Sequence, residues 1–96
     1  MHKKRSSIEV IISILEACNK GDIKKTRIMF ITYLNPRSFY RYIEILKSKG
    51  FISLNTDETY ELTPKGYDYL DKAKEYLEIK RKLQILKKEL DFNSQN

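Results

Sequence analysis

Several residue types are scarce in this 96-residue chain, and each scarcity excludes a class of protein. Cys18 is the one cysteine, so no internal disulfide can form, and this fits a reducing compartment. The one histidine is His2, so a zinc site or a histidine-dependent catalytic site has almost nothing to be built from. We therefore expect a protein that is not an enzyme and that holds no metal and no cofactor.

Long hydrophobic runs are also missing. The longest is Ile28-Met29-Phe30-Ile31, far too short to cross a membrane, and the N-terminal residues lack the apolar segment of a secretory signal. We expect a cytoplasmic protein with no membrane partner. Hydrophobic residues still make up 41% of the chain and charged residues 33%, which suits one small folded domain.

Positive charge is concentrated in the first half of the chain. Residues 1–50 carry eleven basic and four acidic side chains, a balance of +7, whereas residues 51–96 carry eight and nine, a balance of −1. Such segregation indicates a nucleic acid, an anionic membrane surface, or a basic face that serves only solubility.

Two helices are predicted before residue 33. Ser6 and Glu9 have the spacing of a capping box, and Gly21 suits a helix end, so we expect a helix over about 7–19. Asp22 is a plausible N-cap for a second helix over about 23–32. The expected buried side of that second helix consists of Ile28, Phe30, Ile31 and Leu34.

A third helix follows after a turn of a few residues. Asn35 and Pro36 form an N-cap followed by proline at the first helical position, and Gly50 ends the segment. Its apolar stripe consists of Phe39, Tyr42, Ile43 and Leu46. Two helices joined this closely have the spacing of a helix-turn-helix.

The periodicity changes after Gly50. Alternating residues in 51–56 and 59–63, with turn residues at 55–58, predict a short β-hairpin. Thr63-Pro64 then begins a helix over about 64–90, roughly 40 Å long. We predict a mostly α fold with a small β-hairpin, namely a winged helix-turn-helix domain over 6–66 and a long C-terminal dimerisation helix over 64–91.

Particular segments carry a family resemblance. Residues 46–52 and 60–66 resemble the recognition-helix exit and the wing exit of many winged-helix regulators. Residues 14–18, 25–29 and 41–43 are similar to motifs of the crenarchaeal small winged-helix chromatin proteins of the 10a type, over about residues 5–90. The resemblance implies a nucleoid-associated protein that binds double-stranded DNA with little sequence preference, bends or bridges it, and dimerises through an antiparallel coiled coil.

The candidate DNA-binding residues are basic or polar and fall on three segments. Outward positions of the third helix lie near the end that enters a major groove in such motifs, although an ordinary solvated face would look the same. The second helix begins with cations that suit DNA phosphates or pair internally with Glu16, and the N-terminal tail is either a phosphate contact or merely solvated. The candidates are Arg37, Ser38, Tyr40, Arg41 and Lys47, then Lys24, Lys25 and Arg27, then Lys3, Lys4 and Arg5.

Two features of the sequence, the wing tip and the tyrosines other than Tyr40, are left out of the predicted DNA interface. The wing tip carries Asp57 and Glu58, so we leave the wing out of the site. Tyrosines could suggest base stacking, but by spacing only Tyr40 is expected to be exposed, so we do not assign a single-strand binder.

The long helix carries a heptad stripe that would be an exposed patch in a monomer. The predicted dimer interface is Tyr76, Ile79, Leu83, Leu86 and Leu90. A parallel pairing sets Lys82 against Lys87 of the partner and Glu75 against Lys80. An antiparallel one sets Glu75 against Lys82 instead, so the charges lean toward the antiparallel dimer. The alternative is a helix that folds back or frays.

Three functions remain open. The first is a homodimeric chromatin protein that contacts phosphates, and the second is a sequence-specific regulator that reads bases with Arg37, Ser38 and Arg41. The third is a protein-interaction module on the same scaffold, which the acidic wing favours.

Overall fold

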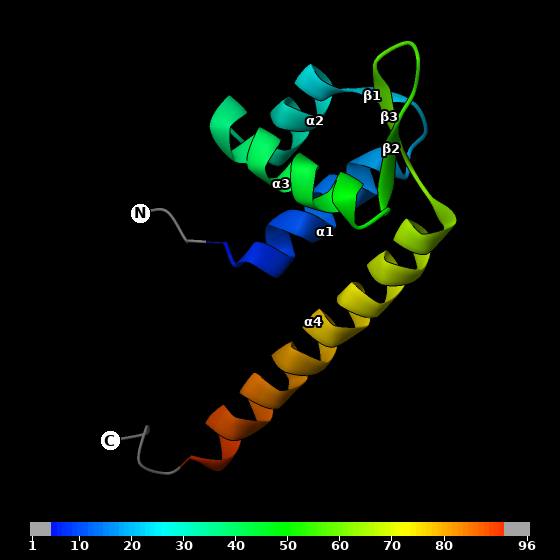
Figure 1. Cartoon of the computed structure of the whole chain (residues 1–96). Helices are drawn as coiled ribbons and strands as arrows, with labels where there is room; N and C mark the ends of the chain where they lie inside the picture. Colours follow the sequence, from blue (N-terminus) through cyan, green and yellow to red (C-terminus); the bar gives the residue numbers. More distant parts are fainter. Residues whose placement is uncertain (1–4, 92–96) are drawn as a thin grey trace.

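Four helices and three short strands make up residues 5–91, the part of the chain that this computed structural model describes (Figure 1). In chain order they are α1 (Ser7–Cys18), β1 (Ile23–Lys24), α2 (Lys25–Thr32), α3 (Pro36–Ser48), β2 (Ile52–Leu54), β3 (Thr59–Leu62) and α4 (Pro64–Leu90). This is the order of a winged helix-turn-helix followed by a long helix, so the predicted fold class is confirmed.

Side-chain caps fix where three of the helices begin. The Ser6 hydroxyl accepts a hydrogen bond from the Glu9 backbone N–H, and the Glu9 carboxylate accepts one from the Ser6 N–H, so the capping box is formed. The side-chain oxygen Oδ1 of Asn35 accepts from the Ser38 backbone N–H at 2.8 Å and starts α3. The Thr63 hydroxyl does the same for α4 with the Gly66 N–H at 2.9 Å.

The start of the second helix was predicted wrongly. Ile23 and Lys24 form strand β1, α2 begins only at Lys25, and its N-cap position is Lys24, which makes no side-chain cap hydrogen bond. Strand β1 pairs antiparallel with β3, so the sheet has the order β1-β3-β2 instead of being a two-stranded wing. Because β1 exists through pairing with Tyr60 and Thr59 far along the chain, no local pattern marks it.

The core lies between α1, α3, the sheet and the first part of α4. Phe39, Ile43 and Leu46 of α3 are fully buried, as are Ile14 and Leu15 of α1. The sheet and α4 contribute the buried residues Phe51, Ile52, Leu62, Leu70 and Ala73. The anchoring of the wing by Phe51, Ile52 and Leu62 is therefore confirmed, as is the α3 stripe, in which Tyr42 is only partly buried.

Phe30 corrects the stripe that was predicted for α2. Ile28 is fully buried and Ile31 and Leu34 are partly buried, but Phe30 is 72% exposed. A helix of eight residues has only a few positions that face the core, and Phe30 occupies a position that faces solvent.

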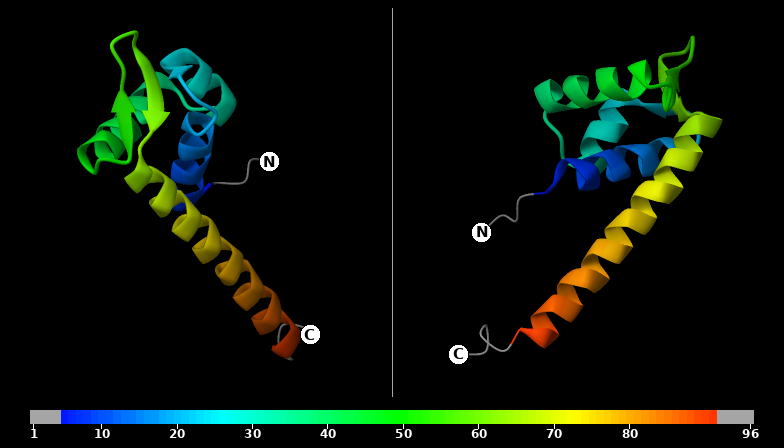
Figure 2. Two further views of the ribbon diagram at one scale, coloured as in Figure 1. Left: turned by 90° about the vertical axis from the view of Figure 1, so that its right-hand side faces the viewer. Right: turned by 60° about the horizontal axis from the view of Figure 1, so that its bottom comes forward.

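The long helix leaves the domain after its first turns. Leu70 and Ala73 are buried and Leu77 is half-buried, whereas every residue from 78 to 91 is exposed. Figures 1 and 2 show the distal part of α4 running away from the layer formed by α1 and α3, and the molecule reaches 58 Å along its longest axis. Half of α4 is therefore not needed to cover this domain's core.

Gly66 is expected to tolerate no side chain. A Cβ there would lie 2.1 Å from the Phe51 carbonyl oxygen, which already accepts a hydrogen bond from the Thr63 N–H at 3.0 Å. In an open helix Gly→Ala stabilises by about 1 kcal/mol, but here we expect Gly66→Ala to destabilise by about 2 kcal/mol or more. Thermal unfolding should show a melting temperature lower by roughly 10 °C. The neighbouring Lys65→Ala is the control; it loses a cation–π contact with Phe51 and should cost less than about 1 kcal/mol. An increase for Gly66→Ala would contradict the close packing.

Candidate nucleic-acid interface

The connection between α2 and α3 is fixed by backbone geometry. Tyr33 has φ 59°, in the left-handed region, and ends α2 with its N–H bonded to the Met29 carbonyl. The Leu34 N–H bonds to the same carbonyl at 3.1 Å, and Asn35 then caps α3. The chain thus reverses within three residues and sets the two helices of the helix-turn-helix against each other.

The outer face of α3 carries the arginines predicted for DNA contact. Arg37, Tyr40 and Arg41 are exposed, and neither arginine forms an ion pair with any residue among 5–91. Arg41 lies 5.7 Å from the centroid of the Tyr42 ring, which supports its guanidinium against the helix. Two guanidiniums therefore face solvent from the first turns of α3 without a compensating carboxylate.

The other two α3 candidates are less free. Ser38 is half-buried and its backbone N–H is used by the Asn35 cap. Lys47 lies 3.7 Å from the Glu44 carboxylate, one turn earlier on the same helix. Both remain predictions, but any ligand would compete with these contacts.

A hydrogen bond joins the start of α2 to α3. The Lys25 ammonium donates to the Tyr40 hydroxyl at 2.7 Å and lies 5.4 Å from the centre of the Tyr40 ring. The hydrogen bond to Tyr40 raises the pKa of Lys25. The contact places Lys25 of α2 beside the exposed face of α3.

Lys24 and Arg27 complete the basic residues at the start of α2. Both are exposed, and the predicted alternative of pairing with Glu16 does not occur, because the Glu16 carboxylate binds Lys74 of α4 at 3.2 Å. We call the five exposed cations of this region the α2–α3 surface: Lys24, Lys25, Arg27, Arg37 and Arg41.

The N-terminal candidates are only partly described. The Arg5 guanidinium donates to the Thr32 carbonyl at 2.7 Å, at the C-terminal end of α2, where the helix dipole favours a cation. Arg5 thus holds the beginning of α1 against the end of α2, a role that its place in a basic tail did not indicate. Lys3 and Lys4 lie outside the described residues.

The carboxylates of the wing tip serve the wing's own turn. Asp57 accepts hydrogen bonds from the Thr59 hydroxyl at 2.6 Å and the Thr59 N–H at 3.3 Å. The bond from the Thr59 hydroxyl lowers the pKa of Asp57. Glu58 follows in the left-handed conformation, with φ 64°. Asp57 therefore helps to hold the hairpin turn in shape. The wing tip, residues 55–58, carries no lysine or arginine that could contact a phosphate.

Aromatic side chains at and just after the end of α2 are exposed, which the sequence does not indicate. Tyr33 is 88% exposed, and the Arg27 guanidinium carbon lies 5.9 Å from the ring centroid of Phe30. Tyr67 and Tyr76 are also about half exposed, so the expectation that only Tyr40 would be exposed is wrong. An aromatic residue in a short helix next to buried isoleucines gives no signal of its exposure.

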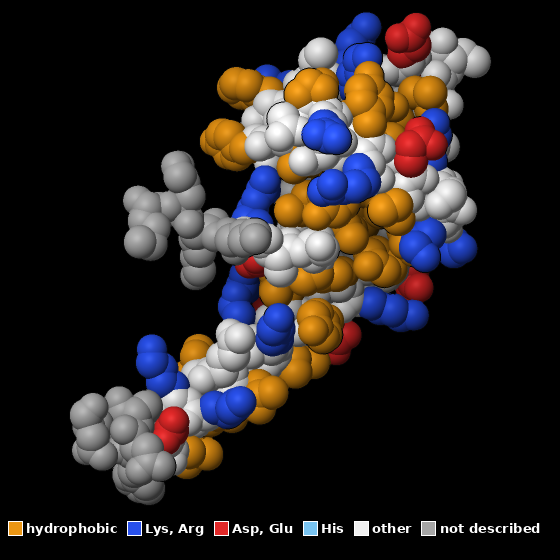
Figure 3. Space-filling model, turned by 60° about the vertical axis from the view of Figure 1, so that its left-hand side comes forward, with side chains coloured by type: hydrophobic (Ala, Val, Ile, Leu, Met, Phe, Trp, Pro, Cys, Tyr) orange, Lys and Arg blue, Asp and Glu red, His pale blue; other side chains and the backbone are white. Residues whose placement is uncertain are grey.

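The predicted dimer residues form an exposed apolar stripe. Their exposed fractions lie between 53% for Leu86 and 73% for Leu90. In the space-filling view hydrophobic side chains follow one edge of the projecting helix (Figure 3). The seam, meaning Tyr76, Ile79, Leu83, Leu86 and Leu90, thus has no partner within residues 5–91.

We also searched residues 5–91 for a metal site, a membrane-spanning helix and a reactive thiol. No three potential metal-ligating side chains gather among these residues, and none of their helices is both long and apolar enough to cross a membrane. Burial raises the pKa of the Cys18 thiol to about 12, so this side chain is not a thiolate nucleophile at neutral pH.

Comparison with known proteins places this geometry in a known group. The family model for winged helix-turn-helix proteins matches residues 4–81. Uncharacterized protein MJ0287 of Methanocaldococcus jannaschii is 43% identical over 76 residues, which are 79% of this chain and 77% of that protein. Uncharacterized protein MJ0290 of the same organism is 40% identical over 76 residues, and the chain spans only 36% of its length.

A solved structure has the same fold over most of both chains. It is that of Sso10a-2, a DNA-binding protein from Sulfolobus solfataricus, with a TM-score of 0.80 and 25% sequence identity. The match covers 90% of this chain and 93% of that one, so it includes the long helix as well as the winged domain.

Proposed function

Because this chain belongs to the winged helix-turn-helix family, we propose that its α2–α3 surface binds double-stranded DNA. The DNA-binding activity stated for the structurally similar Sso10a-2 supports this assignment. The acidic wing tip stays away from the phosphates, and binding uses the backbone more than the bases. As a DNA-binding protein of this kind, the chain is part of the nucleoid and has no catalytic activity.

The observation that carries the proposal is the Lys25–Tyr40 contact beside two unpaired arginines. It aligns cations from two helices along one exposed face, which is the arrangement that phosphate contact requires. In a helix-turn-helix, the second helix of the unit lies in the major groove while the first crosses the backbone. Here α3 would enter the groove with Arg37 and Arg41, and Lys24 and Lys25 would approach the adjacent phosphates.

We further propose a homodimer formed by the seams of two α4 helices. An exposed stripe of large apolar side chains costs free energy in water and is removed when two copies pair. Residues 64–78 carry three basic and four acidic side chains, whereas residues 79–91 carry five basic and two acidic. An antiparallel pairing places the basic end of each helix beside the acidic half of its partner, which favours that orientation.

The chromatin role is favoured over a sequence-specific regulator because the exposed groups of α3 are mainly cations. Fluorescence anisotropy with several unrelated duplexes of equal length, at one salt concentration, tests this choice. We expect dissociation constants within about threefold of one another. One duplex bound tenfold or more tightly than the rest would favour the regulator, since a bidentate base contact discriminates by about 1–3 kcal/mol.

Tyr40→Phe tests the contact that carries the proposal. The change removes the hydroxyl that holds the Lys25 ammonium and keeps the ring. We expect DNA affinity to fall by about two- to fivefold with the fold unchanged, because an exposed charged hydrogen bond contributes modestly. Tyr67→Phe, on an exposed tyrosine of α4, is the matched control. Equal affinities for wild type and Tyr40→Phe would show that Lys25 is not positioned by Tyr40 for binding.

A further inference from the structure

A second basic surface lies on the other side of α1 from α3. It is a cleft of about 690 Å³ between the N-terminal end of α1 and the distal half of α4. Figures 1 and 2 both show α1 between α3 and this part of α4. A straight duplex on the outer face of α3 therefore cannot also lie in the cleft.

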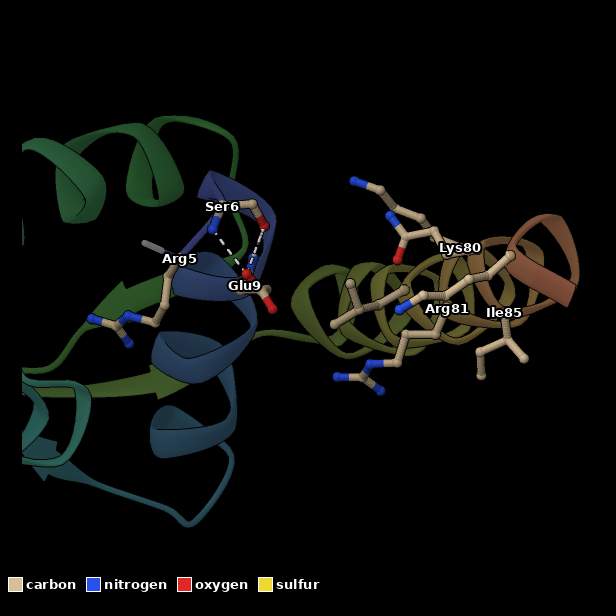
Figure 4. A pocket seen from close by; sticks show the side chains of 9 residues that line it. Arg5, Ser6, Glu9, Lys80, Arg81 and Ile85 are labelled. Atoms are coloured by element: carbon tan, nitrogen blue, oxygen red, sulfur yellow. Dashed lines mark hydrogen bonds between the residues drawn. The ribbon is translucent and has the colours of Figure 1, made fainter. Parts of the chain in front are cut away.

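Three cations of α4 line this cleft. Figure 4 shows Lys80 and Arg81 extending from α4 toward the beginning of α1. Lys88 lines the same cleft, about 12 Å further along the helix than Lys80. None of the three forms an ion pair with another residue of the described chain, 5–91.

The α1 side of the cleft sets one carboxylate against these three cations. Glu9 is the acidic residue of the lining, and its carboxylate is hydrogen-bonded to the Ser6 backbone and hydroxyl. The Arg5 guanidinium points away from α4, toward the Thr32 carbonyl that it binds (Figure 4). The cleft is thus a concave surface with an excess of positive charge on α4.

The cleft remains open in the proposed dimer. The seam uses Tyr76, Ile79, Leu83 and Leu86, whereas the cleft uses Leu77, Arg81, Gln84 and Lys88. At 100° per residue these two sets fall on opposite sides of α4, and Lys80 lies between them at the edge of the seam. Pairing of two seams therefore leaves the side of the cleft formed by Arg81 and Lys88 accessible. Arg81 and Lys88 therefore remain available to a ligand in the proposed dimer.

We propose that this cleft binds the phosphate backbone of a second DNA duplex, so that each chain holds two duplexes. The inference rests on the proposed function, since it assigns a second surface for the same ligand. A row of unpaired cations along a helix, facing an open concavity, suits a polyanion with regularly spaced charges. Bridging of DNA would then be a property of each protomer as well as of the dimer.

The stoichiometry of short duplexes tests the proposal directly. Duplexes of about 10 base pairs, roughly one helical turn, are titrated at low salt into the full chain and the complexes are weighed by sedimentation. We expect two duplexes per chain for the wild type. The variant Lys80→Gln/Arg81→Gln/Lys88→Gln should bind one, and Arg37→Ala/Arg41→Ala should also bind close to one.

A charge-matched control distinguishes DNA binding in the cleft from attraction of DNA to the net positive charge of the protein. Lys20→Gln/Lys65→Gln/Lys87→Gln removes the same charge outside the cleft and should keep two duplexes per chain. One duplex per wild-type chain, or two per cleft variant, would overturn the proposal while leaving DNA binding by the α2–α3 surface intact. If the cleft variant still binds two duplexes per chain but differs from the wild type in self-association, the cleft binds protein, and the proposal is overturned too. If no duplex binds at all, it is the proposed function that fails.

Discussion

Replacing Arg37 and Arg41 with alanine is expected to weaken binding to every duplex by roughly 30-fold or more. The two guanidiniums are exposed on the first turns of α3 and have no carboxylate partner among residues 5–91, so their charge is free for phosphates. A hydrogen bond to a charged group contributes about 1.5–3 kcal/mol, and an exposed pair loses part of that to solvent. Anisotropy at constant salt measures the loss.

The matched control is Lys20→Ala/Lys65→Ala, which removes two exposed cations outside α2 and α3. It should weaken binding no more than about threefold. A loss confined to one sequence would indicate base reading by these arginines in place of phosphate contact. Equal effects of the two double variants would show that net charge, and not the α2–α3 surface, controls the affinity.

The second large effect concerns the seam on α4. Leu83→Glu/Leu86→Glu places two carboxylates per chain at positions that are 56% and 53% exposed in the single chain and face the partner in the proposed dimer. Burying them unpaired costs several kcal/mol per charge, so the dimer should dissociate. Light scattering is expected to give the mass of one chain, 11.5 kDa, in place of two.

Ile85 provides a sharp control for this experiment. It is 57% exposed, as open as Leu83, but it lines the cleft on the other side of α4. Ile85→Glu should therefore remain a dimer while Leu83→Glu/Leu86→Glu does not. Dissociation of both variants, or of neither, would contradict a dimer built on the seam.

Much of the fold could be predicted because local signals agree with tertiary structure. Capping residues at Ser6, Asn35 and Thr63 fix helix starts by hydrogen bonds within three residues, and sequence alone reveals these. The long helix was predicted with the bounds Pro64–Leu90 that the structure has. Its buried first turns and exposed stripe follow from the spacing of apolar residues.

The features that the sequence did not predict depend on contacts between residues that are far apart in the chain. Strand β1 exists because Ile23 pairs with Tyr60, and Arg5 is engaged because the end of α2 comes to lie beside it. Phe30 was expected inside because α2 is apolar around it, but the helix packs on another line. For the candidate site, the basic residues were found by type, whereas the bond that aligns Lys25 with α3 required the folded chain.

The central claim is that the α2–α3 surface binds DNA through phosphates, and the salt dependence of wild-type binding to a single short duplex tests it most directly. Each phosphate contact contributes a slope of about −0.9 in log K against log salt, so the surface's five cations predict a slope of roughly −4.5. Tight binding at low salt that falls with such a slope would support the claim. Absence of binding at low salt, or affinity that is independent of salt, would contradict it.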